Sequence, residues 1–396
     1  MSRDRLERPC TNRILNSQRT VALLTTGRQD WGILRSTCTL LRDDPAFELR
    51  VLAGGMHLSS RFGDTGRLIE AEGFSVAAAL PWTADDPAGA SHHEAARAVG
   101  LVGDALEQEQ PDFLILVGDR FETAAAALAA TLQRVPIVHL HGGEETAGAF
   151  DNSLRHAITK LAHLHLVSHP LHAARVIAMG EDPSTVHVVG APGLDNMHRR
   201  DLPTRTELEV SLGVQLRPPV VVVTHHPATL GGNPESEASA IVTVMDRVDA
   251  TYVVTMPNTD PGSDIILRIF HDACGRPSRV SVDALGERRY WGLLRIADVL
   301  LGNSSSALIE GTALGVPAVN VGDRQAGRLR GENVIDVPAD SWRIEVALRM
   351  CLSEDFRARS VVAHSPYGDG HSGSRVLDIL KRWTPPKPPR KPPVSV

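Results

Sequence analysis

The segment Val299-Leu-Leu-Gly-Asn-Ser-Ser-Ser-Ala-Leu-Ile-Glu310 decides the fold of this chain. A short apolar run ends in Gly302 and Asn303, three serines follow, and the pattern then predicts a helix that carries Glu310. A strand that turns into a helix through small polar residues exposes backbone N–H groups, and the helix dipole adds positive potential, so a phosphate is favoured there. The alternative is an ordinary helix start with Ser304 or Ser305 as its N-cap.

Seven further apolar runs end in polar or glycine-rich residues in the same manner. They lie at 21–24, 49–52, 113–117, 137–138, 220–223, 252–254 and 318–321. Aliphatic runs without alternation are typical of strands that are buried on both faces of a parallel sheet. Because parallel sheets bind ligands beyond the carboxyl ends of their strands, the reactive side chains that follow these runs are expected to gather there.

Strand-like and helix-like segments alternate along the whole chain, which predicts βαβ units. The predicted fold class is α/β, with two doubly wound, Rossmann-like parallel-sheet domains that face a central cleft. We expect the following parts: a flexible N-terminal extension (1–18), an N-terminal domain (19–195), a C-terminal nucleotide-binding domain (196–371), a helix that crosses back to the first domain (372–383), and a disordered proline-rich tail (384–396).

Composition limits the classes of partner. The net charge of −6 gives no support for binding to nucleic acid or to a membrane surface. No apolar stretch approaches the ~18 residues that a membrane span needs. The four cysteines are scattered without metal or disulfide spacing, which favours reduced thiols in the cytoplasm. No metal site and no cofactor are predicted, and the sequence contains no P-loop motif.

Several polar residues that follow the predicted strands are candidates for chemistry. His226 could transfer a proton or contact a phosphate, although a buried structural histidine is the alternative. Asp119 and Arg120 could act as a base and a phosphate clamp, or could simply pair with each other. Glu144 and Asp151 flank a Gly-Gly turn, where converging carboxylates could yield a base near neutral pH.

The two halves of the chain also offer groups that could meet across the cleft. Arg28 and Arg324 each follow a strand, one in each half, which suits a clamp on a diphosphate. Glu310 lies on a helix whose start is expected to face the cleft, where its carboxylate could accept hydrogen bonds from sugar hydroxyls.

Taken together, these segments resemble the hydrolysing UDP-N-acetylglucosamine 2-epimerases, the family that makes N-acetylmannosamine for sialic acid synthesis. The resemblance covers roughly residues 20–340 and rests on motifs in family order: Thr-Gly-Arg-Gln-Asp-Trp-Gly32, Gly-Gly-Met-His57, Val-Gly-Asp-Arg120, His-Gly-Gly-Glu144, Arg155-His-Ala-Ile-Thr-Lys-Leu-Ala-His163, Gly-Asn-Ser-Ser-Ser306 and Gly-Asp-Arg-Gln325. The family fold is of the glycosyltransferase B type, which agrees with the two domains predicted above.

The resemblance implies roles for individual residues. The residues implied to bind UDP or the sugar are Arg28, His57, Arg120, Asn258, Asn303, Ser304, Ser305, Glu310 and Arg324, with His226 in the same pocket. The residues implied in catalysis are Asp119, Glu144, Asp151, His226 and His141. In this family UDP leaves by elimination across carbons 1 and 2, and water then adds to the glycal with inverted stereochemistry at carbon 2. Neither a metal nor a redox cofactor is needed. We also expect a homo-oligomer, either a dimer or a tetramer.

One position departs from the sialic-acid-type members, which have glutamate where this chain has His141. Some bacterial relatives that act on a 2,4-diacetamido-trideoxy sugar nucleotide resemble the His-Gly-Gly-Glu form. Both UDP-GlcNAc and such a relative therefore remain open as the substrate. Three other activities also remain open: a non-hydrolysing 2-epimerase, a glycosyltransferase of the same architecture, and a non-catalytic protein that binds nucleotide sugars.

Overall fold

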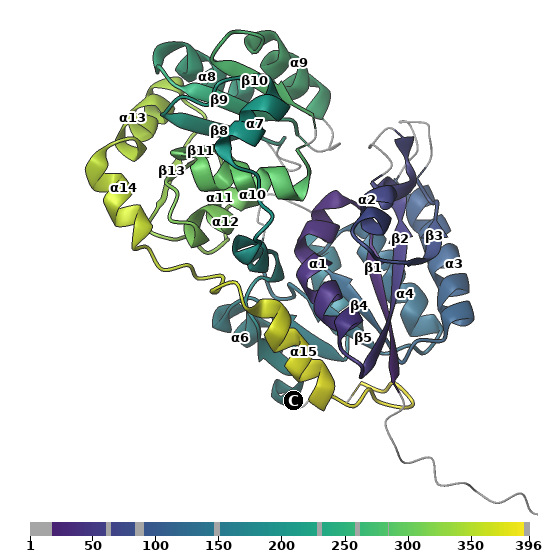
Figure 1. The fold of residues 1–396 in the computed structure, drawn as a ribbon. Coiled ribbons are helices and arrows are strands. Elements are labelled where there is room, and N and C mark those ends of the chain that lie inside the picture. Colours follow the sequence, from purple (N-terminus) through teal and green to yellow (C-terminus); the bar gives the residue numbers. More distant parts are fainter. Residues whose placement is uncertain are drawn as a thin grey trace, which may run out of the picture.

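The computed structural model describes residues 18–60, 65–83, 91–145, 151–227, 232–257, 262–283 and 285–391. Within these residues the strands form two sheets, one in each of two lobes (Figure 1). The first sheet has seven strands, in the spatial order β3 (Val76–Leu80), β2 (Phe47–Gly54), β1 (Arg19–Thr25), β4 (Phe113–Val117), β5 (Ile137–Leu140), β6 (Leu164–Val167) and β7 (Val186–Val188). The second has six, in the order β10 (Arg279–Val282), β9 (Thr251–Thr255), β8 (Val220–Thr224), β11 (Val299–Gly302), β12 (Ala318–Val321) and β13 (Val334–Val337).

All neighbouring strands in both sheets of the described chain run parallel. The prediction of two doubly wound parallel-sheet domains is therefore confirmed. In each sheet the chain starts near the middle and reverses direction, so that β1 lies between β2 and β4, and β8 lies between β9 and β11. Ligands of such sheets bind at this reversal, beyond the carboxyl ends of the strands.

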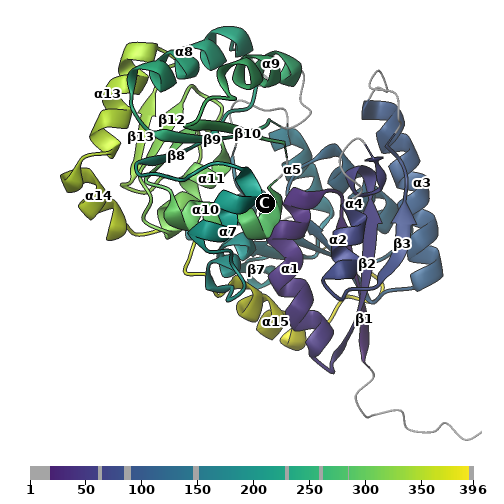
Figure 2. The ribbon, with the colours of Figure 1, turned by 45° about the horizontal axis from the view of Figure 1, so that its top comes forward.

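Helices cover both faces of each sheet (Figures 1 and 2). Those of the first lobe are α1 (Arg28–Asp43), α2 (Gly66–Ala71), α3 (Ser91–Glu109), α4 (Phe121–Leu132), α5 (Asp151–Leu161) and α6 (Pro170–Ala178), with the short turns η1 (Gly55–Leu58) and η3 (Pro183–Thr185). Those of the second lobe are α7 (Arg205–Leu212), α8 (Pro234–Arg247), α9 (Ser263–Ala273), α10 (Gly286–Ile296), α11 (Ser305–Leu308), α12 (Glu310–Ala313), α13 (Ser341–Cys351) and α14 (Glu354–Val361). The turn η4 (Pro192–His198) joins the lobes, and α15 (Ser372–Arg382) closes the fold.

The central strands are buried on both faces, as their unbroken apolar sequences require. In β1, Val21 and Leu23 pack in a cluster with α1 and α15, while Ala22 and Leu24 pack on the opposite face with α3, α4 and α5. The second sheet is covered by α8, α9 and α13 on one face and by α7, α10 and α11 on the other. Burial on two faces explains why these strands lack the period-two alternation of a half-exposed sheet.

The C-terminal segment returns to the first lobe. Helix α15 contributes Val376 and Leu380 to the apolar cluster beside α1, and the chain then runs along the same lobe (Figure 2). Lys387 pairs with Asp112 at 2.7 Å, and Lys391 pairs with the buried Glu181. Both lysines belong to the tail for which the sequence predicted disorder, and the local composition gives no sign of their distant carboxylate partners.

Candidate active site

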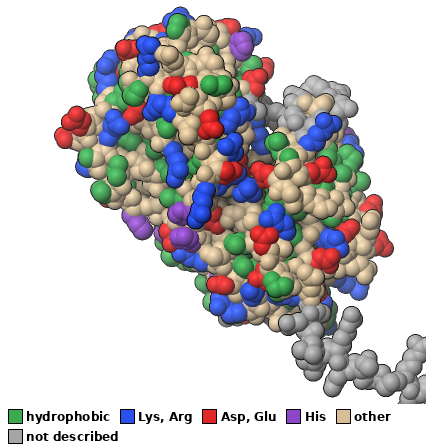
Figure 3. All heavy atoms as spheres, in the orientation of Figure 1, with side chains coloured by type: hydrophobic (Ala, Val, Ile, Leu, Met, Phe, Trp, Pro, Cys, Tyr) green, Lys and Arg blue, Asp and Glu red, His purple; other side chains and the backbone are tan. Residues whose placement is uncertain are grey.

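The cleft between the two lobes has a volume of about 280 Å³. Figure 3 shows the groove between the lobes, with acidic and basic side chains along its rim. The residues that line it come from both lobes: Arg28, Gln29, Gly32, Ile33, Gly193, Asn196, Thr224, His226, Thr255, Met256, Val282, Asp283, Leu285, Gly286, Glu287, Tyr290, Trp291, Ser304, Ser305, Ser306 and Glu310. Most of these residues follow the carboxyl end of a strand, which is where the parallel topology places a ligand.

The serine-rich segment begins with a close approach between β8 and β11. Gly302 has a φ of +131°, and a Cβ at this position would lie 2.0 Å from the carbonyl oxygen of Thr224. Only glycine fits there without moving the backbone. Ser304 follows as the N-cap of α11, where its hydroxyl accepts a 3.3 Å hydrogen bond from the backbone N–H of Ser306. The predicted helix is divided at Ile309, so that Glu310 begins the separate α12.

Asn303 fixes this segment against the loop after β8. Its Oδ1 accepts from the backbone N–H of His226 at 2.7 Å, and its Nδ2 donates to the carbonyl of the same residue at 2.8 Å. Its own carbonyl accepts from Gln325 Nε2 at 2.7 Å and from Arg324 Nη1 at 3.3 Å. The sequence predicted that Asn303 binds substrate. In the structure both polar atoms of its buried side-chain amide bond to the backbone of His226, and a role of Asn303 in binding stays a prediction.

The two adjacent histidines after β8 face different surroundings. His225 is fully buried, and its Nε2 lies 2.9 Å from Glu237 Oε2. His226 lines the cleft. Burial, followed by the positive charges of Arg324 and of other nearby groups, holds the pKa of His226 well below its usual range. A ring that is neutral at physiological pH can exchange a hydrogen bond with a ligand in the cleft but does not offer it a positive charge.

Arg28 reaches across the cleft from the start of α1. Its two Nη atoms lie 3.4 and 3.5 Å from the carbonyl oxygen of Asp283 in the other lobe. These contacts are long, so the guanidinium is placed to exchange them for an anionic ligand.

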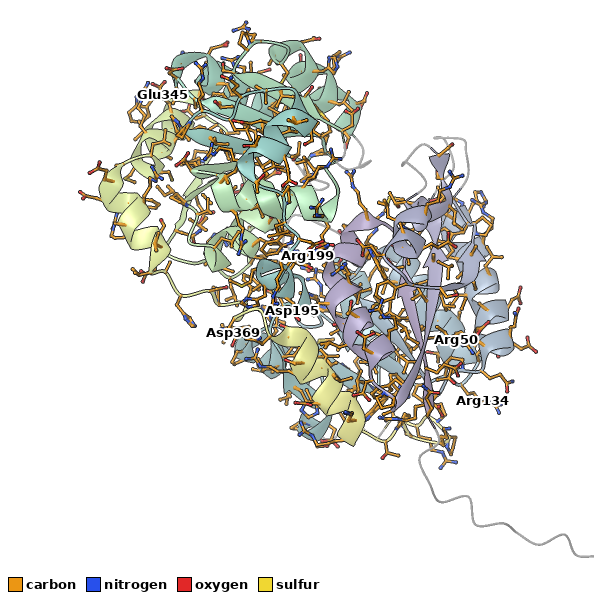
Figure 4. All side chains as sticks on the ribbon, in the orientation of Figure 1. Arg50, Arg134, Asp195, Arg199, Glu345 and Asp369 are labelled. Carbon is orange, nitrogen blue, oxygen red and sulfur yellow. The ribbon has the colours of Figure 1, made fainter. Side chains whose placement is uncertain are left out.

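Figure 4 shows Asp195 and Arg199 at the junction of the lobes. Arg199 there holds Glu287, a residue of the cleft wall, at 2.9 Å.

A second polar cluster lies at the strand ends of the first lobe. Arg155 of α5 is 2% exposed, and it pairs with Asp119 beyond β4 and donates to the carbonyl of Glu144 beyond β5. It also donates to Asn152 Oδ1 at 3.1 Å. Asp151 begins the same helix. One buried guanidinium therefore connects the three segments that carry Asp119, Glu144 and Asp151.

Glu144 is buried and accepts two short hydrogen bonds at the same oxygen. His141 Nδ1 lies 2.6 Å from Glu144 Oε1, and Ser168 Oγ donates to Oε1 at 2.8 Å. Burial alone would raise the pKa of the Glu144 carboxyl. The neighbouring His141 and two nearby arginines outweigh burial and hold this pKa well below its usual range. Glu144 is therefore a carboxylate at physiological pH and a weak base.

Glu310 is a buried carboxyl in the wall of the cleft. Its carboxyl lines the cleft, and burial raises its pKa, while a hydrogen bond from Ser306 and the charges of His141 and Arg328 oppose that rise. Its Oε2 is buried and has no hydrogen-bond partner among the described residues.

Three further predicted ligand residues lie away from the cleft lining or outside the described residues. The ring of His57 is 1% exposed, with Nε2 2.9 Å from Thr25 Oγ1 and Nδ1 2.8 Å from Thr65 Oγ1. Both ring nitrogens are thus within hydrogen-bond distance of hydroxyl groups, and the role of His57 in binding stays a prediction. Arg120 pairs with Glu122 at 3.0 Å, and it is not among the residues that line the cleft. Asn258 lies outside the described residues.

Other residues of the site were not singled out from the sequence. Tyr290 donates to Ser306 Oγ at 2.8 Å, and burial raises the pKa of its hydroxyl. Ser168 and His172 contact the Glu144 cluster from the segment after β6. Arg155 opens a motif quoted above, but the sequence alone did not show that its charge is buried.

The family model described as UDP-N-acetylglucosamine 2-epimerase matches residues 39–381. The chain belongs to this family. The resemblance inferred from the sequence is thereby confirmed, and the protein is an enzyme of the epimerase family.

Similar members of the UDP-N-acetylglucosamine 2-epimerase family come from several bacteria. A UDP-N,N'-diacetylbacillosamine 2-epimerase (hydrolyzing) of Legionella pneumophila is 33% identical, over 92% of this chain and 96% of the relative. A GDP/UDP-N,N'-diacetylbacillosamine 2-epimerase (hydrolyzing) of Campylobacter jejuni is 32% identical, over 86% of this chain and 89% of the relative. The crystal structure of UDP-GlcNAc 2-epimerase from Neisseria meningitidis bound to UDP-GlcNAc has the same fold, with a TM-score of 0.80 and 14% identity over 92% of this chain and 100% of that one.

Two further observations bear on this family member. Among the described residues, no group of three or more His, Cys, Asp or Glu side chains is arranged to hold a metal ion. None of the described helices has the length and apolar character that a membrane span needs.

Proposed function

We propose that this protein is a hydrolysing 2-epimerase that converts a UDP-linked 2-acetamido sugar to the free 2-epimer and UDP. The observation that carries the proposal is a cleft at the carboxyl ends of the strands of both lobes, lined by Ser304, Ser305, His226 and Glu310 of the second lobe and by Arg28 of the first. The named activities of relatives that are 32% and 33% identical over most of the chain support it. UDP would leave by elimination across carbons 1 and 2, and water would then add to the glycal.

The second lobe and Arg28 would hold the nucleotide. Ser304 and Ser305 offer hydroxyl groups and the backbone N–H groups of a helix start, which suit phosphate oxygens. Arg28 lies opposite, and Arg324 lies behind Asn303. The neutral ring of His226 would complete this binding surface. The arginines would offset the charge of the diphosphate locally, since the chain itself carries a net charge of −6.

Proton transfer would occur on the first lobe. Inversion at carbon 2 requires one group that removes a proton and another that delivers a proton to the opposite face. Asp119, Asp151 and His141 are the candidates, because Arg155 and its helix hold their segments together. Glu144 is a poorer candidate, because its carboxylate is a weak base.

For the sugar, we propose a substrate with acetamido groups at both carbon 2 and carbon 4. The support is that both relatives described above are named for N,N'-diacetylbacillosamine, and that this chain has His141 where sialic-acid-type members have glutamate. The product would then be a 2,4-diacetamido relative of N-acetylmannosamine, used for a sialic-acid-like sugar. UDP-GlcNAc is the alternative, and it would give N-acetylmannosamine itself.

The test is UDP release from the two sugar nucleotides, measured side by side as kcat/KM. We expect the diacetamido substrate to be preferred, and we expect His141→Glu to shift the ratio toward UDP-GlcNAc without abolishing turnover. An unchanged ratio in His141→Glu would remove the specificity argument. UDP transfer to an added acceptor would favour a glycosyltransferase, and binding without turnover would favour a non-catalytic protein.

Three further properties remain predictions. They are a homo-oligomer of two or four subunits, a location in the cytoplasm, and catalysis without a metal ion. Activity that persists after thorough treatment with EDTA would agree with the last of these. Loss of activity that a divalent metal restores would contradict it.

A further inference from the structure

The chain that follows α15 runs across the amino ends of the first-lobe strands (Figure 1). Arg19, the first residue of β1, donates to the carbonyls of Leu380 and Trp383 at 2.7 and 2.8 Å. The Trp383 ring meets Phe113, the first residue of β4, edge-on with 5.4 Å between the ring centroids. Because the cleft lies at the carboxyl ends of these parallel strands, this segment occupies the opposite end of the sheet.

Further contacts carry the tail toward β6. Lys387 pairs at 2.7 Å with Asp112, which directly precedes β4. His163, which directly precedes β6, accepts the backbone N–H of Ile137 at its Nδ1, with 3.2 Å between the nitrogens. His163 also forms a hydrogen bond with the backbone of Pro389, and because proline has no N–H, the carbonyl of Pro389 is the acceptor. The tail thus contacts the segments that lead into both strands.

The last of these contacts enters a buried carboxylate site. Glu181 is buried, and its carboxylate lies 2.6 Å from Nζ of Lys160 and 3.0 Å from Nε2 of His165. Lys391 of the tail pairs with the same carboxylate and also donates to the carbonyl of Ala162. A buried carboxylate is stable only where it is paired and hydrogen-bonded. The tail therefore supplies one of the groups that this carboxylate needs.

The two lysines of the tail differ in the strength of their attachment. The side chains of Lys387 and Asp112 are 71% and 27% exposed, so water and salt screen their attraction. The side chains of Lys391 and Glu181 are 29% and 3% exposed. Removing one partner of a buried pair leaves an uncompensated charge, whereas removing an exposed pair has little effect. Lys391 is therefore the point at which the tail is fastened.

The Glu181 site joins elements whose other ends reach the polar cluster of the first lobe. Lys160 lies in the last turn of α5 and also donates to the carbonyl of Met179, just after α6, at 3.1 Å. His165 lies in β6. At the opposite ends of the same elements, Arg155 belongs to the buried cluster on α5, and Ser168 follows β6. The tail thus holds α5 and β6 at the end away from the cleft.

The spacing of the two lysines matches the spacing of the strands. Lys387 and Lys391 are four residues apart, and four residues of chain reach at most ~14 Å. Asp112 and Ala162 precede β4 and β6, which have one strand between them, so the distance to cover is about two strand spacings, or ~10 Å. The prolines between the lysines restrict the undocked chain, which lowers the entropy that docking costs.

We propose that residues 384–391 form a strap that closes the amino end of the first sheet, that Lys391 fastens this strap in the buried site of Glu181, and that undocking of the strap loosens α5 and β6. The inference does not depend on the proposed function. Because α15 stays packed on the first lobe, an undocked strap rebinds within the same molecule at a high effective concentration. Undocking is then a local opening of the first lobe that needs less free energy than global unfolding.

The first test compares three substitutions in the tail by thermal denaturation of the full chain. Lys391→Met removes the charge that enters the Glu181 site but keeps an unbranched side chain. We expect it to lower Tm by roughly 3–6 °C, because the buried carboxylate loses one partner while its other two remain. Lys387→Met and Arg390→Met remove the same charge from exposed positions of the tail, and each should change Tm by less than about 1 °C.

A double-mutant cycle shows whether Lys391 acts through Glu181. In a Glu181→Gln background the carboxylate charge is gone, so Lys391→Met should shift Tm by less than half of its effect in the wild type. An equal shift in the two backgrounds would show that the lysine acts elsewhere, and it would overturn the assignment of the fastening site.

Amide hydrogen exchange shows where the protein opens. In Lys391→Met we expect the amides of β6 and of the last turn of α5 to exchange at least about tenfold faster, while those of β8 in the second lobe keep their wild-type rates. Equal acceleration in both lobes would contradict a local opening. Unchanged Tm and unchanged exchange in Lys391→Met, or a loss of Tm in Arg390→Met as large as in Lys391→Met, would overturn the strap altogether.

Discussion

The substitution Asn303→Asp tests whether the serine-rich segment depends on one buried amide. Asn303 is 1% exposed, and its Nδ2 donates to the carbonyl of His226 at 2.8 Å. The substitution keeps the acceptor oxygen and replaces this donor by a carboxylate oxygen that faces the carbonyl. A buried carbonyl left unsatisfied costs about 1–3 kcal/mol, and repulsion between the two oxygens adds to that. We therefore expect the free energy of unfolding to fall by at least this amount, and UDP affinity to weaken.

Urea denaturation and calorimetry with UDP would measure the two effects. Asn333→Asp is the matched control, because Asn333 Nδ2 makes a comparable 2.7 Å bond to the carbonyl of Val316 in the same lobe. It should lose similar stability but keep UDP affinity. Because burial favours the protonated form of the introduced carboxyl, which can donate again, the deficit of Asn303→Asp should shrink as the pH falls. Unchanged UDP affinity in folded Asn303→Asp would refute the reasoning.

Three further predictions concern other parts of the molecule. Arg28→Ala and Ser304→Ala should each weaken UDP binding by ~1.5–3 kcal/mol, the contribution of a hydrogen bond to a charged oxygen, as read by calorimetry; equal affinity in both would remove the nucleotide site. Asp119→Asn and Asp151→Asn should lower kcat by ~10²–10⁴-fold while UDP affinity is kept, and near-normal rates would remove them from proton transfer. Burial alone would raise the pKa of Glu181, but bonds to a histidine and two lysines lower it from 4.5 to about 2. Because the folded pKa lies below the unfolded value, the stabilisation is full above about pH 4.5 and is lost as the pH falls toward 2, so Glu181→Gln should lack this slope in acid denaturation.

The fold could be predicted wherever the residues of a segment themselves indicate its secondary structure and burial. All eight apolar runs proved to be strands, because a run that is buried on both faces leaves a continuous aliphatic signature. Strands β3, β6, β7, β10 and β13 were not predicted, and most of them lie at or near a sheet edge with polar residues. In β6, His165 is fully buried only because Glu181, sixteen residues later, accepts its hydrogen bond at 3.0 Å. Sequence periodicity carries no signal for such a distant partner.

The site shows the same limit. Gly302 and the serines after it predicted the second-lobe part of the cleft. This was possible because a glycine and a capping serine set the local backbone geometry without distant partners. The role of Arg155 could not be predicted, because its charge is buried only through Asp119, thirty-six residues away, and the carbonyl of Glu144. The resemblance implied that His57 binds the ligand, and the structure adds that hydroxyl groups of Thr25 and Thr65 lie within hydrogen-bond distance of its two ring nitrogens. Long-range pairing decided each of these cases.

The most direct test of the central claim is the product formed in heavy water, observed by NMR. The protein is incubated with UDP-GlcNAc and, separately, with its 2,4-diacetamido relative. We predict free UDP and a free sugar of inverted configuration with deuterium at carbon 2, from at least one of them. A product that remains linked to UDP, or a free sugar that retains its original hydrogen and configuration at carbon 2, would contradict the claim.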